Sequence, residues 1–317
     1  MKNILITIVV IALAGAGAYI WYNAQSPAEI DLDVTDEQPT ETIVDPDEEI
    51  TEPEEDEQDV TLEEPDTERP EREVLGQSVS GNDIVAYNLG TGDETVLFVG
   101  GMHGGYSYNT ALLGYELVDH LRSNPNLIPE NITVTVIPTL NVDGIERATG
   151  DTGRFTSTDV TTNEAEQAAS RFNANNVDLN RNFDCNWSPE GTWRDQTVSG
   201  GASVFSEPEA QAVRAFVQDH SPVAVVAWYA AAGEVFASSC GDAPVMEETQ
   251  QLMELYATQS GYTAQQEFTY YPITGDMTDW LAQQQIPAIS VLLTDRVNTE
   301  WNRNRTAIEA LLRELAS

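Results

Sequence analysis

The chain has 317 residues, and its 53 Asp and Glu against 14 Lys and Arg give a formal net charge of −39 at pH 7. A charge this negative argues against nucleic acid as a partner, because affinity for nucleic acid comes mostly from Lys and Arg on phosphates. It also argues against docking on anionic lipid headgroups.

An uncharged and mostly apolar run from Ile4 to Tyr22 comes first. As a helix it would span roughly 28 Å, about the hydrocarbon thickness of a bilayer. Trp21 and Tyr22 close the run as interfacial aromatics do, and Lys2 on the short side favours a cytoplasmic N-terminus. We therefore expect residues 1–22 to anchor the chain in the cell membrane with its C-terminal domain outside the cytoplasm. A cleaved signal peptide is the alternative, because residues 14–18 are small.

Residues 23–73 are rich in Pro, Thr, Asp and Glu. From Ala28 to Glu73 there are 22 Asp or Glu against Arg69 and Arg72. Such a segment cannot bury enough apolar surface to offset chain entropy, and self-repulsion keeps it extended. We expect a disordered acidic linker.

From residue 74 to 317 the composition is that of a globular domain. The predicted strands are 96–99, 133–140, 223–228 and 288–293, and the predicted helices are 110–121, 206–217, 248–259 and 306–315. Ser206 is the expected N-cap of the helix 206–217. Apolar runs that alternate with helices indicate one α/β domain with a central mixed, mostly buried sheet flanked by helices.

Five short motifs occur within this domain, and their order carries more information than any one of them. They are Val99-Gly100-Gly101-Met102-His103-Gly104-Gly105, Asn141-Val142-Asp143-Gly144, Val177-Asp178-Leu179-Asn180-Arg181-Asn182-Phe183, Ser206-Glu207-Pro208-Glu209 and Gly275-Asp276-Met277-Thr278-Asp279-Trp280. With these motifs the run from about 75 to 317 resembles the carboxypeptidase A-like zinc carboxypeptidases, in particular their bacterial secreted branch. The resemblance implies zinc-dependent release of C-terminal residues.

The residues that would hold a substrate carboxylate match the family. Asn180 and Arg181 fall at the positions of its terminal-carboxylate pair, and Arg171 falls where the family has a further carboxylate-contacting arginine. Tyr271 matches the tyrosine that closes over the substrate. Asp143 matches the carboxylate that orients the first zinc histidine. The resemblance thus implies that the binding site for peptide C-terminal carboxylates is intact.

The residues that would perform the chemistry do not match. The family holds zinc with two His and one Glu and uses a second Glu as general base. His103 is the only retained ligand; Tyr106 and Tyr229 stand at the other two ligand positions, and Leu292 stands at the general-base position. A neutral imidazole with a phenol is a poor zinc site. We therefore expect that zinc, the family's cofactor, is not bound, and that the two tyrosines and Leu292 pack around His103.

The two cysteines, Cys185 and Cys240, are a candidate disulfide in an extracytoplasmic chain, and two separate buried thiols are the alternative. The resemblance favours the bridge, since the secreted relatives have a cysteine pair at about these places.

Three functions remain open. The first is a membrane-tethered, catalytically degenerate domain that recognises C-terminal carboxylates of peptides or proteins, including cell-wall peptides. The second is an active zinc carboxypeptidase with atypical ligands, such as His103 with Asp143 and a tyrosinate or water. Its least unsuitable candidate base is Glu234, beyond the strand end at Tyr229. The third is a structural or partner-binding ectodomain with a vestigial pocket.

Overall fold

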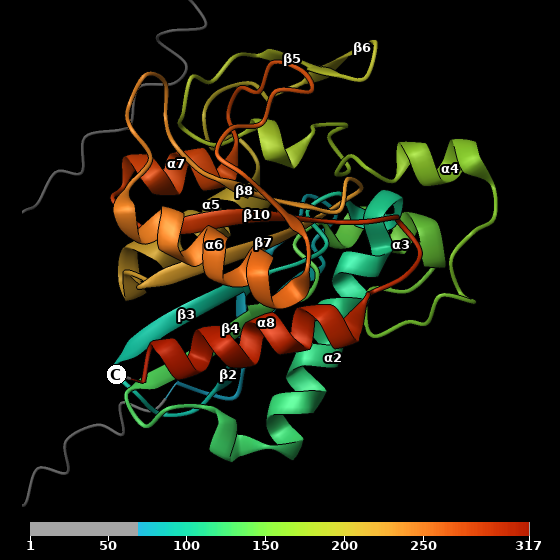
Figure 1. Cartoon of the computed structure of the whole chain (residues 1–317). Helices are drawn as coiled ribbons and strands as arrows, with labels where there is room; N and C mark the ends of the chain where they lie inside the picture. The colour runs from blue at the N-terminus through green and yellow to red at the C-terminus, as the bar shows by residue number, and fades with distance from the viewer. Residues whose placement is uncertain (1–68, 317) are drawn as a thin grey trace, which may run out of the picture. The chain divides into compact units, whose positions relative to one another are not determined.

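The computed structural model describes residues 69–316, which belong to one compact unit from Glu63 to Ser317. The predicted anchor and most of the predicted linker lie outside the described residues. None of the helices in the described part is long and apolar enough to cross a membrane. The predicted α/β class, with a large mixed sheet flanked by helices, is confirmed (Figure 1).

The central sheet of the described residues has eight strands in the order β1-β2-β4-β3-β7-β10-β8-β9. Its central strands β4, β3, β7 and β10 run parallel to one another. The strands are β1 (Arg72–Gln77), β2 (Asp83–Leu89), β3 (Glu94–Val99), β4 (Ile132–Ile137), β7 (Ala224–Ala230), β8 (Glu234–Ala237), β9 (Thr263–Gln265) and β10 (Ala288–Leu293). A separate hairpin is formed by β5 (Glu190–Trp193) and β6 (Gln196–Ser199).

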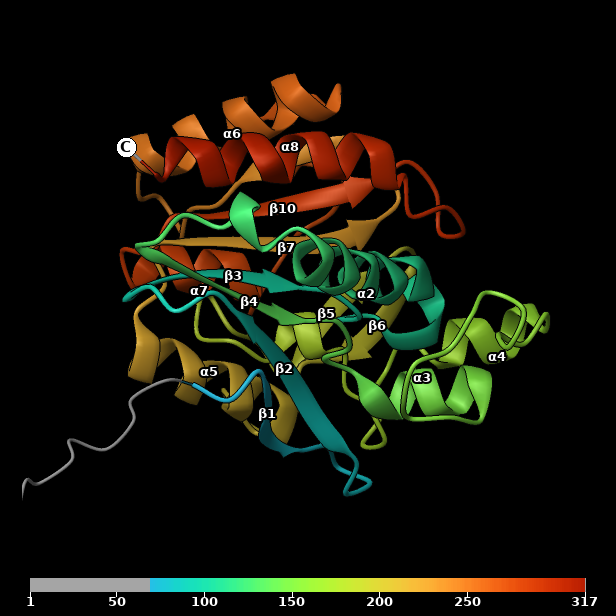
Figure 2. The ribbon, with the colours of Figure 1, turned by 90° about the horizontal axis from the view of Figure 1, so that it is seen from below.

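Side chains of the central strands are buried on both faces of the sheet. In β3, Val96 and Phe98 belong to one apolar cluster and Leu97 and Val99 to the other, as the two-residue period of a strand requires. Helices α2 (Tyr108–Ser123), α6 (Glu247–Ser260) and α8 (Trp301–Glu314) contribute to the first cluster, and α5 (Pro208–His220) and α7 (Met277–Gln283) to the second. Figure 2 shows α6 and α8 on one side of the strands and α5 on the other.

The shorter helices lie in the connections between these layers. They are α3 (Val142–Thr149), α4 (Glu164–Ala169), and the 3-10 turns η1 (Gly104–Ser107), η2 (Pro125–Leu127) and η3 (Leu179–Arg181). The turns η1 and η3 carry the glycine-rich motif and the Asn180-Arg181 pair, so both motifs lie outside the regular core.

Two boundaries differ from the sequence expectation. Strand β1 begins at Arg72, and Arg69 already donates to the Thr95 side chain (2.8 Å), so the domain begins before residue 74. Helix α5 begins at Pro208 with Glu207 at the N-cap. Ser206 does not cap it, because its hydroxyl bonds to the Glu207 carboxylate instead (2.7 Å).

Candidate functional site

The site lies where the parallel strands end. His103 follows the glycine turn after β3, Tyr229 is the penultimate residue of β7, and Leu292 is the penultimate residue of β10. The register pairs Leu292 with Tyr229. In open α/β sheets, ligands bind at the carboxyl ends of the strands, and here these ends border a pocket of about 430 Å³.

Two glycines allow the site loops to approach closely. Gly104 has φ +45°, and a Cβ there would lie 2.4 Å from the carbonyl oxygen of Ser170. Gly275 has φ +65°, and a Cβ there would lie 2.2 Å from the carbonyl oxygen of Arg181. The loop before α7 therefore rests directly on the backbone of Arg181, and a larger residue at 275 would displace that arginine.

His103 is buried, and its ring lies beside Asp178. Its Nε2 is 3.5 Å from Asp178 Oδ1, longer than a good hydrogen bond, and neither ring nitrogen has a hydrogen-bond partner among the described residues. Burial, followed by the positive charge of Arg171, lowers the pKa of His103 to about 4. The imidazole is therefore neutral at physiological pH, and this contact is not an ion pair.

Asp143 does not orient His103, which corrects the assignment made from the resemblance. Its carboxylate accepts hydrogen bonds from the Ser78 hydroxyl, the Asn82 side chain (3.1 Å) and the backbone of Ser80 (3.2 Å). Asp143 thus joins α3 to the turn between β1 and β2. The carboxylate next to His103 belongs to Asp178, a residue that the third sequence motif contains but to which no role had been given.

Arg171 is held by the same carboxylate. Its Nε and Nη2 donate to Asp178 Oδ2 at 3.0 and 2.8 Å, and both side chains are almost completely buried. Burial alone would raise the pKa of Asp178, but Arg171, with His103 and Arg181, holds it well below its usual value. Arg171 still borders the pocket, although its charge is already neutralised by Asp178.

Asn180 makes hydrogen bonds to three of its neighbours. Its Nδ2 donates to Asp276 Oδ2 (2.6 Å), while its Oδ1 accepts from the Tyr229 hydroxyl (3.1 Å) and from the Met277 backbone (3.2 Å). One N–H of the amide remains for a ligand, because an amide nitrogen carries two donors.

Arg181 is a buried cation with only carbonyl partners. Its side chain donates to the carbonyl oxygens of Asn180 (2.9 Å) and Thr192 (3.2 Å), and its buried Nε has no partner. It is 1% exposed and borders the pocket, yet within the described residues it forms no ion pair. A guanidinium has five N–H donors, so several remain for an anion. Tyr271 lies close by, with the Arg181 guanidinium 5.8 Å from its ring centre.

The two tyrosines that the resemblance places at ligand positions have partners of their own. The Tyr106 hydroxyl accepts a hydrogen bond from Arg194 Nη2 (2.6 Å), and its ring contacts Trp193 edge-on. Tyr229 packs against His103 with ring centres 5.5 Å apart, as expected, and burial raises its pKa well above the usual value. Tyr106 instead turns its hydroxyl toward Arg194. The expected packing of both tyrosines around His103 is thus found for Tyr229 and not for Tyr106.

Leu292 borders the pocket at the general-base position and cannot accept a proton. Glu234, the candidate base of the second function, is not among the residues that line the pocket. Its carboxylate accepts hydrogen bonds from Tyr270 and Gln265. Across residues 69–316 no group of three His, Cys, Asp or Glu side chains could hold a metal ion. The donors around His103 therefore do not fit a zinc ion, whose sites in proteins take at least three such ligands.

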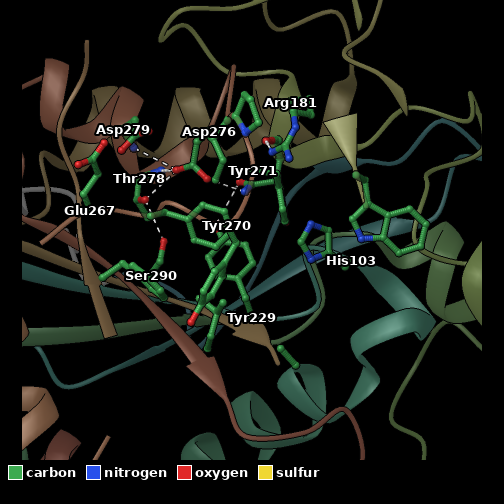
Figure 3. A pocket seen from close by; sticks show the side chains of 18 of the residues that line it. His103, Arg181, Tyr229, Glu267, Tyr270, Tyr271, Asp276, Thr278, Asp279 and Ser290 are labelled. Atoms are coloured by element: carbon green, nitrogen blue, oxygen red, sulfur yellow. Dashed lines mark hydrogen bonds between the residues drawn. The ribbon is translucent and has the colours of Figure 1, made fainter. Parts of the chain in front are cut away.

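The far end of the pocket is polar and acidic. Figure 3 shows Glu267, Asp279, Thr278 and Ser290 on the side away from His103. Burial, followed by the negative charge of Asp276, raises the pKa of Asp279 to about 8. Thr278 and Asp279 stand in the last of the five motifs, but no role was assigned to any of these four residues from the sequence.

The disulfide between Cys185 and Cys240 is confirmed, with Cα atoms 5.8 Å apart. Cys185 follows η3, and its carbonyl oxygen accepts a hydrogen bond from Gly275 N (2.8 Å). The bridge therefore braces the same loops that position Arg181.

The mixed sheet is covered by helices on both faces, and the buried Arg181 borders the pocket at its strand ends. Residues 61–314 match the family model described as zinc carboxypeptidase. The chain therefore belongs to the zinc carboxypeptidase family.

Solved structures of three relatives share the fold. Bovine thrombin-activatable fibrinolysis inhibitor in complex with tick carboxypeptidase inhibitor is 18% identical (TM-score 0.61, 78% of this chain and 88% of that chain). Carboxypeptidase A from Helicoverpa armigera is also 18% identical (TM-score 0.61, 77% and 68%). Murein-tripeptide amidase MpaA from Escherichia coli O157 is 20% identical (TM-score 0.55, 78% and 94%). At these identities the likeness shows the fold alone.

Among curated proteins, bacteriocin BCN5 of Clostridium perfringens is 26% identical over 166 residues, which is 50% of this chain and 16% of that protein. The chain thus spans well under a quarter of the length of that relative.

Proposed function

We propose that this chain binds the C-terminal carboxylate of peptides at Arg181 and does not hydrolyse them by the zinc mechanism of its family. The observation that carries the proposal is the state of Arg181: a buried guanidinium with an unpartnered Nε that borders a pocket and has no carboxylate partner among the described residues. Burying a charge is costly unless it is paired. A carboxylate ligand would supply the missing partner in a charge-assisted hydrogen bond.

The donor set supports the proposed loss of hydrolysis. Two ligand positions hold phenols that already bond to Arg194 and Asn180, and the base position holds Leu292. The carboxylates considered for an altered site, Asp143 and Glu234, are engaged elsewhere, and Asp178 beside His103 is paired with Arg171.

We further propose that residues 1–22 anchor the domain outside the cytoplasm, with residues 23 to about 68 as a spacer. The apolar run at Ile4–Tyr22 supports this, and so does the Cys185–Cys240 bridge, because disulfides persist mainly in oxidising compartments. An outward-facing domain would meet cell-wall peptides and the ends of secreted proteins. Carbonate extraction of membranes tests the anchor: release of the full-length protein into the soluble fraction would contradict it.

The test of the pocket compares one fluorescent hexapeptide as the free acid and as the C-terminal amide, with the full-length protein. We expect the amide to bind at least roughly tenfold more weakly, because a charge-assisted hydrogen bond contributes about 1.5–3 kcal/mol. Arg181→Gln should abolish this difference, whereas Arg147→Gln, at an exposed position of α3 outside the pocket, should preserve it. Equal affinity for acid and amide in the wild-type protein would reject the proposal without reliance on any variant.

Catalysis is tested separately by turnover of the same free acid with added zinc. Release of the C-terminal residue that Arg181→Gln suppresses would show that the family activity is retained, and would overturn the second half of the proposal.

A further inference from the structure

Three guanidinium groups surround the ring of Tyr106. The side chains of Arg171, Arg194 and Arg296 lie 5.8, 5.6 and 4.7 Å from its ring centre. They come from three separate segments: the stretch before η3, the turn between β5 and β6, and the loop after β10. Tyr106 stands where the resembling enzymes have a metal ligand, so this positive cluster lies beside the position at which a relative would hold its cation.

Only one of these three cations is neutralised. Arg171 is paired with Asp178, whereas Arg194 and Arg296 form no ion pair with any described carboxylate. Asp295 is the sequence neighbour of Arg296, but its oxygens accept hydrogen bonds from Val297 and Asn298. Two cations without an ion pair at one aromatic ring are unexpected in a chain with 53 acidic residues and a net charge of −39.

Aromatic contacts position the guanidinium groups of Arg194 and Arg296 without neutralising their positive charge. Arg194 Nη2 donates to the Tyr106 hydroxyl (2.6 Å), and the guanidinium lies 5.0 Å from the Trp193 ring centre. Arg296 lies over the Tyr106 ring itself. Stacking on aromatic faces fixes a guanidinium plane while leaving its edge donors available. Both arginines border the same pocket as Arg181, and neither is fully buried.

We propose that Arg194 and Arg296 form a second anion subsite, which receives an acidic side chain of the peptide whose C-terminal carboxylate is held at Arg181. The inference rests on the proposed function, because it places the two negative groups on one bound peptide. A planar guanidinium pairs with a carboxylate through two parallel hydrogen bonds. The preferred ligand is therefore a peptide with Asp or Glu one or two residues before its C-terminal residue.

The experiment measures binding of matched fluorescent hexapeptides to the full-length protein. One pair carries Asp or Asn at the penultimate position, and a second pair carries Asp or Asn one residue earlier. All four peptides end in the same free-acid leucine. In one of the two pairs we expect the Asp peptide to bind roughly five- to tenfold more tightly than the Asn peptide. The preference should shrink as salt is raised, since the subsite is partly exposed.

Two variants locate the effect. Arg296→Gln leaves the Arg194–Tyr106 hydrogen bond in place, and Arg194→Gln removes it. We expect each to reduce the Asp preference while the preference for free acid over amide remains. Arg147→Gln removes an exposed cation outside the pocket and should change neither ratio.

The outcomes separate the two proposals. Free-acid peptides that bind over amides, with no Asp preference at either position, would overturn the second subsite and leave the proposed function standing. An Asp preference that survives in both variants would likewise reject these two arginines as its cause. Acid and amide peptides that bind equally would overturn both proposals together.

Discussion

The phenol of Tyr229 donates a hydrogen bond to the side-chain oxygen of Asn180 at 3.1 Å. The resemblance in sequence places Tyr229 at a metal-ligand position and Asn180 in the carboxylate-binding pair. In the structure the side chain of Tyr229 instead holds the Asn180 amide in place. The burial of Tyr229 keeps its phenol protonated and therefore a donor. The hydroxyl of Tyr106 does not bond to Asn180; it accepts a hydrogen bond from Arg194.

The first prediction concerns restored zinc binding. The double variant Tyr106→Glu with Tyr229→His gives His103 two further donors, the set that three-ligand zinc sites use. After incubation with zinc and removal of the excess, we expect about one ion per chain in the double variant and far less in the wild type. Because Arg194 will also attract the new carboxylate, adding Arg194→Gln should strengthen zinc binding.

Either single variant is the control for this experiment. Each adds one donor to His103, which makes two donors in total, and should hold little zinc. About one tightly held ion in the wild-type protein would contradict our interpretation of both tyrosines.

The second prediction compares a buried with an exposed arginine–aspartate pair. Asp178 accepts both hydrogen bonds of Arg171 and is 0% exposed. Asp178→Asn leaves the guanidinium buried and unpaired, so we expect a loss of about 3–5 kcal/mol in the free energy of unfolding. Urea denaturation of the full-length protein measures this loss.

The matched control is Asp119→Asn, because Asp119 also accepts two hydrogen bonds from one arginine, Arg154, but on the surface. Here we expect a loss below about 1 kcal/mol. Similar losses in the two variants would show that burial does not set the strength of the Arg171–Asp178 pair.

The central elements could be predicted from the sequence because apolar runs such as 96–99 and 288–293 are buried on both faces and differ clearly from the helices between them. The edge strands were not predicted. Strand β1 has largely exposed or half-buried residues and belongs to the end of an acidic stretch, so its composition resembles the linker. Strands β8 and β9 are too short to show a period.

The members of the site could be identified by motif, but their partners could not. His103 and Asp178 are separated by 75 positions in the numbering, and only the fold brings their side chains within 3.5 Å. For this reason the carboxylate beside His103 was assigned to Asp143, which lies in the first turn of α3 and accepts a hydrogen bond from Ser78 instead. Arg194 and Arg296 belong to no motif, and no sequence signal joins them to Tyr106.

The third prediction concerns pH. Burial, followed by the nearby charge of Asp143, raises the pKa of Glu209 from 4.5 to about 7, although Asn173 and the Val79 backbone donate hydrogen bonds to it. The folded state thus favours the protonated acid. This contribution to stability is fully present below the unfolded pKa and is lost as pH rises through about 7. Its size is at most about 3 kcal/mol.

Glu209→Gln should therefore flatten the decline in unfolding free energy between pH 4.5 and about 7, and urea midpoints across this range measure the slope. Glu130→Gln removes an exposed carboxylate and should leave the slope unchanged. An unchanged slope in Glu209→Gln would assign the pH dependence to other groups.

The last prediction concerns the disulfide. Cys185 and Cys240 are 55 positions apart, and closing a loop of this length restricts the unfolded chain by about 4 kcal/mol in the chain-entropy model. We expect the double variant Cys185→Ala with Cys240→Ala to lose about 2–4 kcal/mol of unfolding free energy. Peptide affinity should also fall, because Gly275 bonds to the Cys185 carbonyl and packs on Arg181. Reduction of the wild-type protein should reproduce both effects and should leave the double variant unaffected. Two free thiols in the unreduced, unfolded wild-type protein would show that the bridge does not form.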